Sequence, residues 1–139
     1  GALVPRARPV LSSRAMTLST WAMLLAGMRV LIGVAPVVAA GPVSRLLGFP
    51  EGHDNPTARL MARWFGVRDA GLGVLVLMFL HEPAALRKVF WLNLAMDLGD
   101  AAMIAIPLAR RQGIDRAALL SLAFALGGAT AWIIALKAF

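Results

Sequence analysis

The sequence predicts an all-α fold, an antiparallel bundle of four transmembrane helices, on three observations. First, 60% of its 139 residues are hydrophobic and only 15% are charged, whereas soluble domains are about 25% charged. Second, four apolar segments are each long enough to cross about 30 Å of hydrocarbon at about 1.5 Å per residue. Third, polar loops with helix-starting prolines separate these segments. A water-soluble fold is therefore not expected.

The first fifteen residues differ from the rest, because Leu3-Val4-Pro5-Arg6 has the sequence of a protease site. We interpret residues 1–15 as a scar of recombinant expression and Met16 as the native start. Residues 16–139 then form a single four-helix transmembrane domain. Without the three arginines of the scar, the net charge falls from +7 to +4. Such an excess is ordinary for a membrane protein, so no nucleic-acid partner is expected.

The first two helices are separated by a polar loop. The first helix is predicted over residues 18–40 and ends where Gly41-Pro42 breaks the helical pattern. The loop follows over residues 44–55. Asn55-Pro56 then combines a capping residue with a proline at the first helical position, which predicts a second helix over residues 56–80.

The third and fourth helices follow the same rules. His81-Glu82-Pro83 is a short turn with a proline at the first helical position, so the second and third helices should be antiparallel neighbours. The third helix is predicted over about residues 83–110. Gly113 supplies a C-terminal stop and Asp115 an N-cap, after which residues 116–138 form the fourth helix.

Charged residues lie at mid-membrane depth in three of the four segments, where an ionised group is costly unless it is paired. They are Arg29 in the first segment, Arg68 and Asp69 in the second, and Asp97 and Asp100 in the third. If successive helices run antiparallel, four of these residues lie at similar depth near the middle of the membrane: Arg29, Arg68, Asp69 and Asp97. Asp100, and Arg63 in the second segment, lie about one turn away. Charges of both signs should therefore converge inside the bundle.

The third helix carries a polar stripe, because Asn93, Asp97 and Asp100 fall within about 60° of one another on a helical projection. Two carboxylates a turn apart beside an arginine would place an acid and a base side by side, so Asp97 and Asp100 are the candidate acid/base residues. The candidate substrate-binding residues are Arg29, Arg63, Arg68, Asp69 and Asn93. The alternative is an internal ion-pair network that fixes helix register.

Small residues form a second pattern, in the fourth helix. Ala123, Gly127 and Ala131 recur at four-residue spacing, which is typical of close helix packing within one protomer or of a homodimer contact. Tryptophans can anchor helices at the membrane interface, and Trp132 is one of four candidates for that role.

The sequence gives no sign of a metal or cofactor site. It contains no cysteine, which excludes disulfides, thiol redox chemistry and thiolate ligands. His53 and His81 lie in separate loops without metal-ligand spacing. No phosphate-binding loop, dinucleotide fingerprint or nucleophile elbow is present. We therefore expect no metal and no cofactor.

Basic residues in the short loops predict the orientation in the membrane. With residues 1–15 left out, the loops after the first and third helices lie on the side with more basic residues, and we expect both termini outside. The basic residues on that side are Arg45, Arg59, Arg110, Arg111 and Arg116, against Arg87, Lys88 and Lys137 on the other. If the arginines of residues 1–15 are native, the count favours the reverse orientation.

Several of these elements resemble one known family. They are the run from Arg29 to Pro36, the run from Arg45 to Pro50, the pattern Arg63-x-x-Gly66-x-Arg68-Asp69-x-x-x-Gly73 and the pair Asp97-x-x-Asp100. Together they resemble small four-helix bacterial membrane proteins of the DoxX-like type, especially the DUF4267 branch. The resemblance implies a four-helix bundle in the inner membrane of a bacterium, and it implies no particular activity.

Three functions fit these observations. The polar pocket could bind or act on a lipid or another lipophilic small molecule, with an arginine stabilising developing negative charge. The protein could be a proton-coupled carrier, although the usual intramembrane glutamate of the small four-helix carriers is replaced by Arg29 in the first helix. The third possibility is a non-catalytic scaffold or accessory subunit. We favour the binding pocket.

Overall fold

The computed structural model describes residues 13–139, which form four α-helices and one short 3₁₀ helix. The helices are α1 (Ser13–Leu47), α2 (Pro56–Met78), α3 (Pro83–Ala109) and α4 (Asp115–Leu136), and η1 (Glu51–His53) lies in the loop between α1 and α2. The all-helical fold with four helices is confirmed. Residues 1–12, most of the predicted scar, lie outside the described residues.

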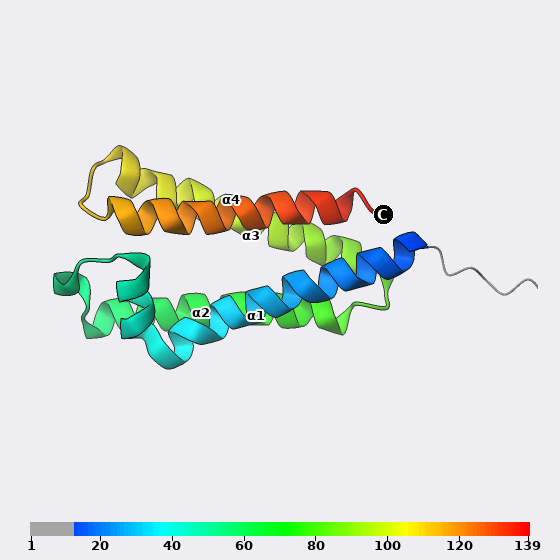
Figure 1. Ribbon diagram of the computed structural model, residues 1–139, viewed down its shortest axis with the longest axis horizontal. Helices are drawn as coiled ribbons and strands as arrows, with labels where there is room; N and C mark the ends of the chain where they lie inside the picture. Colours follow the sequence, from blue (N-terminus) through cyan, green and yellow to red (C-terminus); the bar gives the residue numbers. More distant parts are fainter. Residues whose placement is uncertain (1–12) are drawn as a thin grey trace, which may run out of the picture.

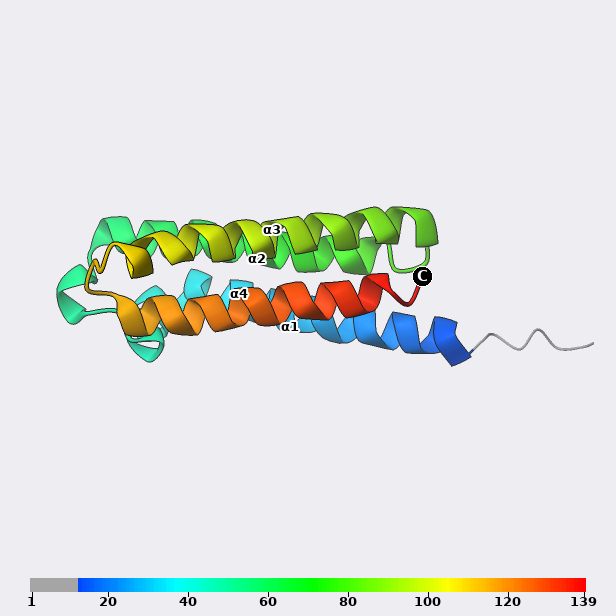
Figure 2. The same cartoon turned by 90° about the horizontal axis from the view of Figure 1, so that it is seen from above.

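The helices pack mainly as two antiparallel pairs, α1 with α2 and α3 with α4. Figure 1 shows these pairs as two layers, and in Figure 2, seen from above, α3 and α4 lie in front with α1 and α2 behind them. The layers approach each other at the end that holds the start of α1 and the end of α4. They diverge toward the end that holds the α1–α2 and α3–α4 connections (Figure 1). The predicted neighbours α2 and α3 are antiparallel, but they pack on each other far less than each packs on its partner.

Local sequence signals set the starts of α2 and α3. The Asn55 side chain accepts a hydrogen bond of 2.9 Å from the backbone N–H of Ala58, and Pro56 opens α2. Pro83 opens α3 in the same way. The start of α4 differs from the prediction, because Ile114 occupies the N-cap position and Asp115 lies in the first turn. A carboxylate in the first turn still interacts favourably with the helix dipole.

The predicted break near Gly41-Pro42 is confirmed, but a second helical segment of α1 follows it and continues to Leu47, so residues 44–47 are helical and do not belong to the predicted loop. The backbone leaves the helical region at Ala39, with φ of −142° and ψ of 53°. Pro42 has no N–H, and its ring would clash with the carbonyl four residues earlier in a straight helix. The N–H groups in the first turn of a helix have no partner within the helix, so a proline in the first turn after the bend loses no hydrogen bond and the helix can resume. The bend carries the end of α1 over the wide end of the bundle.

Glycines allow α1 and α2 to approach closely. A Cβ atom added at Gly33 would collide with backbone atoms of Ala70 and Gly66, and one added at Gly73 would lie 2.8 Å from the carbonyl oxygen of Ala26. Close backbone approach at small residues is a common way for helices to associate in membranes. Ala26 and Gly33 of α1 therefore pack directly against small residues of α2.

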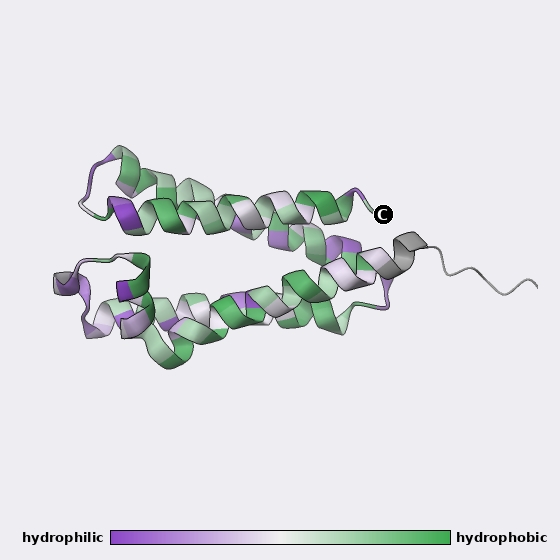
Figure 3. Ribbon diagram, viewed as in Figure 1, coloured by the Kyte–Doolittle hydropathy of each residue, from purple (hydrophilic) through white to green (hydrophobic). Residues whose placement is uncertain are grey.

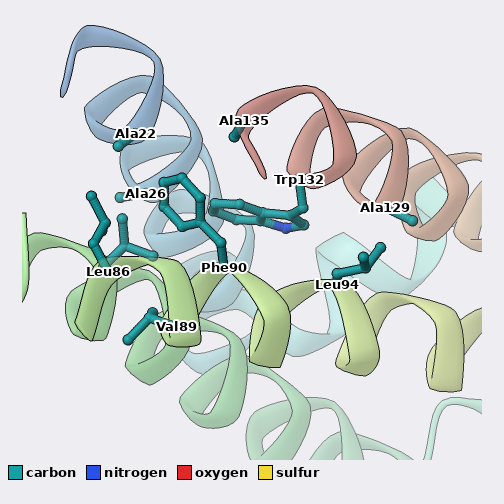
Figure 4. Close-up of a cluster of buried hydrophobic side chains, with 10 residues drawn as sticks. Ala22, Ala26, Leu86, Val89, Phe90, Leu94, Ala129, Trp132 and Ala135 are labelled. Atoms are coloured by element: carbon teal, nitrogen blue, oxygen red, sulfur yellow. The ribbon is translucent and has the colours of Figure 1, made fainter. Parts of the chain in front are cut away.

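A hydrophobic core closes the narrow end of the bundle (Figure 4). Phe90 and Trp132 lie at its centre, with ring centroids 5.3 Å apart, and Phe139 covers the other side of Phe90 at 5.5 Å. The buried residues of this core are Ala22, Ala26, Val76, Leu86, Val89, Phe90, Leu94, Ala129, Trp132 and Ala135. All four helices contribute to it, so the narrow end is sealed by packed apolar side chains.

Three of the described helices are long and apolar enough to cross a membrane: residues 17–47, Pro83–Ala109 and Asp115–Leu136. Figure 3 shows the apolar residues along the helices and strongly hydrophilic residues at the connections. Large apolar side chains face outward, including Leu31 at 70% exposure and Val38 at 75%. The middle of α2 is more polar because it contains Arg63, Arg68 and Asp69. These surfaces suggest a membrane lipid environment.

Candidate functional site

The centre of the bundle is held by a buried ion pair between α1 and α3. Nη1 and Nη2 of Arg29 donate to the two carboxylate oxygens of Asp97, at 3.0 and 2.8 Å. The indole Nε1 of Trp132 in α4 also donates to Asp97 Oδ2, at 3.0 Å. Both Asp97 oxygens are therefore engaged in charge-assisted hydrogen bonds, which are the stronger kind.

Asp69 adds a second carboxylate to Arg29 and connects α2 to the same cluster. Its Oδ1 lies 2.8 Å from Nη2 of Arg29, and its side chain is only 7% exposed. Arg29, Asp69, Asp97 and Trp132 thus join all four helices; we call these residues the central cluster. It contains one cation and two carboxylates.

A second ion pair connects α2 and α3 nearby. Nη1 and Nη2 of Arg68 donate to the two oxygens of Asp100, at 3.0 and 2.6 Å. The Arg68 guanidinium also lies 5.0 Å from the centre of the Phe65 ring, within cation–π range. This pair is more exposed than the central cluster, with 35% of the Arg68 side chain and 24% of the Asp100 side chain accessible. Asp97 and Asp100 are therefore each paired with a different arginine.

Gly128 provides the space for the Asp97 carboxylate, since a Cβ there would lie 2.5 Å from Asp97 Oδ2. We expect Gly128→Ala to displace the carboxylate and destabilise the protein by about 1–3 kcal/mol. Gly127→Ala is the matched control, because no heavy atom lies within 4 Å of its added Cβ. Thermal unfolding in detergent, followed by tryptophan fluorescence, measures both. Equal stability of the two variants would show that Gly128 is not needed for this contact.

A large cavity lies between the two helix pairs, on the wide side of the central cluster. Its volume is about 1340 Å³. Arg29, Asp69, Asp97 and Trp132 line it at the inner end, and residues of the α1–α2 loop line it at the other. Between these ends the walls are mostly apolar, with side chains from all four helices. The cavity is thus an apolar chamber that ends at a buried charged cluster.

The cavity reaches the outer surface of the bundle. Exposed apolar side chains from all four helices line it, including Met28 and Ile32 from α1, Met61 from α2, Met103 from α3 and Phe124 from α4. These exposed lining residues are continuous with the apolar outer surface of the helices, which suggests a membrane lipid environment.

Three of the predicted site residues, Arg63, Arg68 and Asn93, lie outside the cavity lining. Arg63 is exposed on α2 and forms no ion pair with the described residues. Asn93 is fully buried and donates from Nδ2 to the carbonyl oxygen of Val89 at 2.9 Å, while its Oδ1 has no partner. The structure brings together Arg29, Asp69 and Asp97, with Asp100 on the cavity wall. Arg68 contacts the cavity only through its bond to Asp100.

The small-residue stripe of α4 lies on the cavity wall. Ala123, Gly127 and Ala131 all line the cavity, and the space beside Gly127 is empty. At the inner end, the indole N–H of Trp21 donates to the carbonyl oxygen of Ala131 at 3.3 Å. A homodimer through this stripe stays a prediction.

Two contributors to the site were missed by sequence reasoning. Trp132 is 2% exposed and hydrogen-bonded to Asp97, so its predicted role as an interfacial anchor is wrong. Gly128, which makes space for the Asp97 carboxylate, was also missed. Gly128 and Trp132 are four residues apart on α4 and so share a helix face, and this spacing is the sequence signal that could have identified both.

A surface ion pair fixes the loop at the wide end. Nε and Nη2 of Arg59 donate to the two oxygens of Asp54, at 2.7 and 3.0 Å. These hydrogen bonds hold the pKa of the Asp54 carboxyl below its usual range. Gly48 has φ of +91°, a backbone conformation in which other residues are strained, and lies against the Arg116 side chain of α4. The loop thus covers the wide end of the cavity and touches both helix pairs.

Comparisons with known proteins add no relative: no family model, no curated protein and no solved structure matches this chain. Among the described residues no cluster of three or more His, Asp or Glu side chains could hold a metal ion. The functional argument therefore depends on the cavity and the central cluster.

Proposed function

We propose that this chain is a DoxX-like integral protein of a bacterial inner membrane, in which all four helices span the bilayer and the cavity binds a lipophilic small molecule. The observation that carries the proposal is the apolar cavity of about 1340 Å³ that ends at Arg29, Asp69 and Asp97. Ligand sites are typically about 300–1,000 Å³, mostly apolar, with a few polar groups that orient the ligand. The larger volume suits an elongated amphiphile.

Binding is better supported than acid/base catalysis at Asp97 and Asp100. A general acid or base needs a carboxyl oxygen free to reach the reacting proton. Both oxygens of Asp97 are bonded to Arg29, and both oxygens of Asp100 to Arg68. A carrier would need access from both ends, and the core around Phe90 fills the narrow end. We therefore propose binding without a reaction.

A scaffold role is the second candidate, and one observation favours it. The central cluster joins all four helices through hydrogen-bonded charges, which is the arrangement expected of a network that fixes helix register. This candidate leaves the cavity without a role. An occupied cavity would separate the two candidates.

Gly127→Leu tests the binding proposal by filling the cavity. The Gly127 position lines the cavity and has open space around it, so a leucine there should occupy the ligand volume without touching the central cluster. We expect at least a tenfold loss of lipophilic molecules that copurify with the protein, measured by solvent extraction and mass spectrometry.

Gly99→Leu is the matched control. Gly99 is exposed on α3, also has open space around it, and is not part of the cavity lining. Both substitutions replace a helical glycine by leucine, so both should raise helix propensity by a similar amount. The control should retain the bound molecules. If wild type carries none and binds no added amphiphile, or if the two variants bind alike, the scaffold role is favoured.

A further inference from the structure

The buried charges do not balance at the inner end of the cavity. Arg29 and Arg68 supply two positive charges, and Asp69, Asp97 and Asp100 supply three negative ones. Each arginine forms a bidentate pair with one carboxylate, Arg29 with Asp97 and Arg68 with Asp100. Asp69 is the carboxylate that remains.

Asp69 also has one carboxylate oxygen that accepts no hydrogen bond from the described residues. Its ion pair to Arg29 uses Oδ1, and no described residue donates a hydrogen bond to its Oδ2. By contrast, Asp97 receives three hydrogen bonds, two from Arg29 and one from Trp132. Asp69 lines the cavity. A ligand that reaches the inner end therefore meets an acceptor with surplus negative charge.

We propose that the cavity binds single-chain amphiphiles with a cationic amine head group, inserted head-first so that the ammonium lies against Asp69. An ammonium supplies both the missing positive charge and N–H donors for the free oxygen. The apolar walls accommodate the chain. An anionic head group would meet a like charge at short range and low dielectric, where repulsion is strong. This inference rests on the proposed binding function and adds the class of ligand.

The test compares three probes of equal chain length: dodecylamine, dodecanol and dodecanoate. Binding to the purified full chain in one neutral detergent is followed by the change in tryptophan emission, since Trp132 lines the cavity. We expect dodecylamine to bind at least tenfold more tightly than dodecanol, and dodecanoate to bind least. Asp69→Asn should weaken dodecylamine binding about tenfold and leave dodecanol binding within twofold of wild type.

Asp54→Asn is the control for charge alone, because Asp54 also lines the cavity but lies at the wide end and is paired with Arg59. It should preserve the preference for the amine. Equal binding of dodecylamine and dodecanol to wild type would overturn the inference, since a proton would then balance the extra carboxylate. That result is distinct from failure of the binding function, in which Gly127→Leu would leave the binding of all three probes unchanged.

Discussion

Replacing Arg29 by methionine should lower the free energy of unfolding by about 3–5 kcal/mol, the range typical of breaking a buried ion pair by removing one partner. Asp69 and Asp97 are both buried, and Arg29 is the cation within 3 Å of each of them. Methionine fills much of the same volume, so the loss reflects charge more than packing. Reversible unfolding in a mixed-detergent titration, followed by circular dichroism, measures it.

The controls for Arg29→Met separate the loss of a buried, paired arginine from the loss of an exposed one. Arg45 is 54% exposed and its nitrogen lies 3.9 Å from Asp54, so Arg45→Met should change stability by less than about 1 kcal/mol. Adding Asp97→Asn to Arg29→Met removes one of the stranded carboxylates and should recover part of the loss. A cost below about 1 kcal/mol for Arg29→Met alone would mean that the cluster does not hold the helices together.

The fold was predictable where the signal is local. Pro56 and Pro83 marked the first residues of two helices correctly because a proline has the same effect at any helix start. Gly41-Pro42 correctly marked a break in the first helix, but the helical residues 44–47 after it were predicted as loop, because the same residues can end a helix or bend it. Which outcome occurs depends on what the next turn packs against, and that information is spread along the chain.

The site was predictable in its residues and not in its pairings. The antiparallel arrangement of the helices placed Arg29, Asp69 and Asp97 at one depth, and the structure brings them together. The sequence could not show that Asp97 pairs with Arg29 while Asp100 pairs with Arg68, because the pairing depends on which helices are neighbours in the fold. Trp132 was missed for a related reason. An aromatic side chain in an apolar helix gives no sign that its N–H will meet a buried carboxylate.

The second large change in stability is expected for a substitution at the interface between α1 and α2. Gly66→Ala should destabilise the protein by about 2–3 kcal/mol, at the upper end of the usual cost of overpacking. The added Cβ would collide with the carbonyl oxygen of Gly33 and lie 2.8 Å from Val37 and 3.0 Å from Pro36. Because the nearest atom belongs to the backbone, no change of side-chain rotamer relieves the clash, and the two helices must separate. The same detergent titration measures the change.

Gly71→Ala, in the same helix, isolates this steric effect. No heavy atom lies within 4 Å of a Cβ added at Gly71, so only helix propensity changes and the variant should gain up to about 1 kcal/mol. The two substitutions therefore shift stability in opposite directions. Separation of α1 from α2 would also move Arg29 away from Asp69, so Gly66→Ala should reduce amphiphile binding in the cavity as well. If Gly66→Ala proves as stable as Gly71→Ala, the close approach of α1 and α2 is wrong, and with it the geometry that brings Asp69 to Arg29.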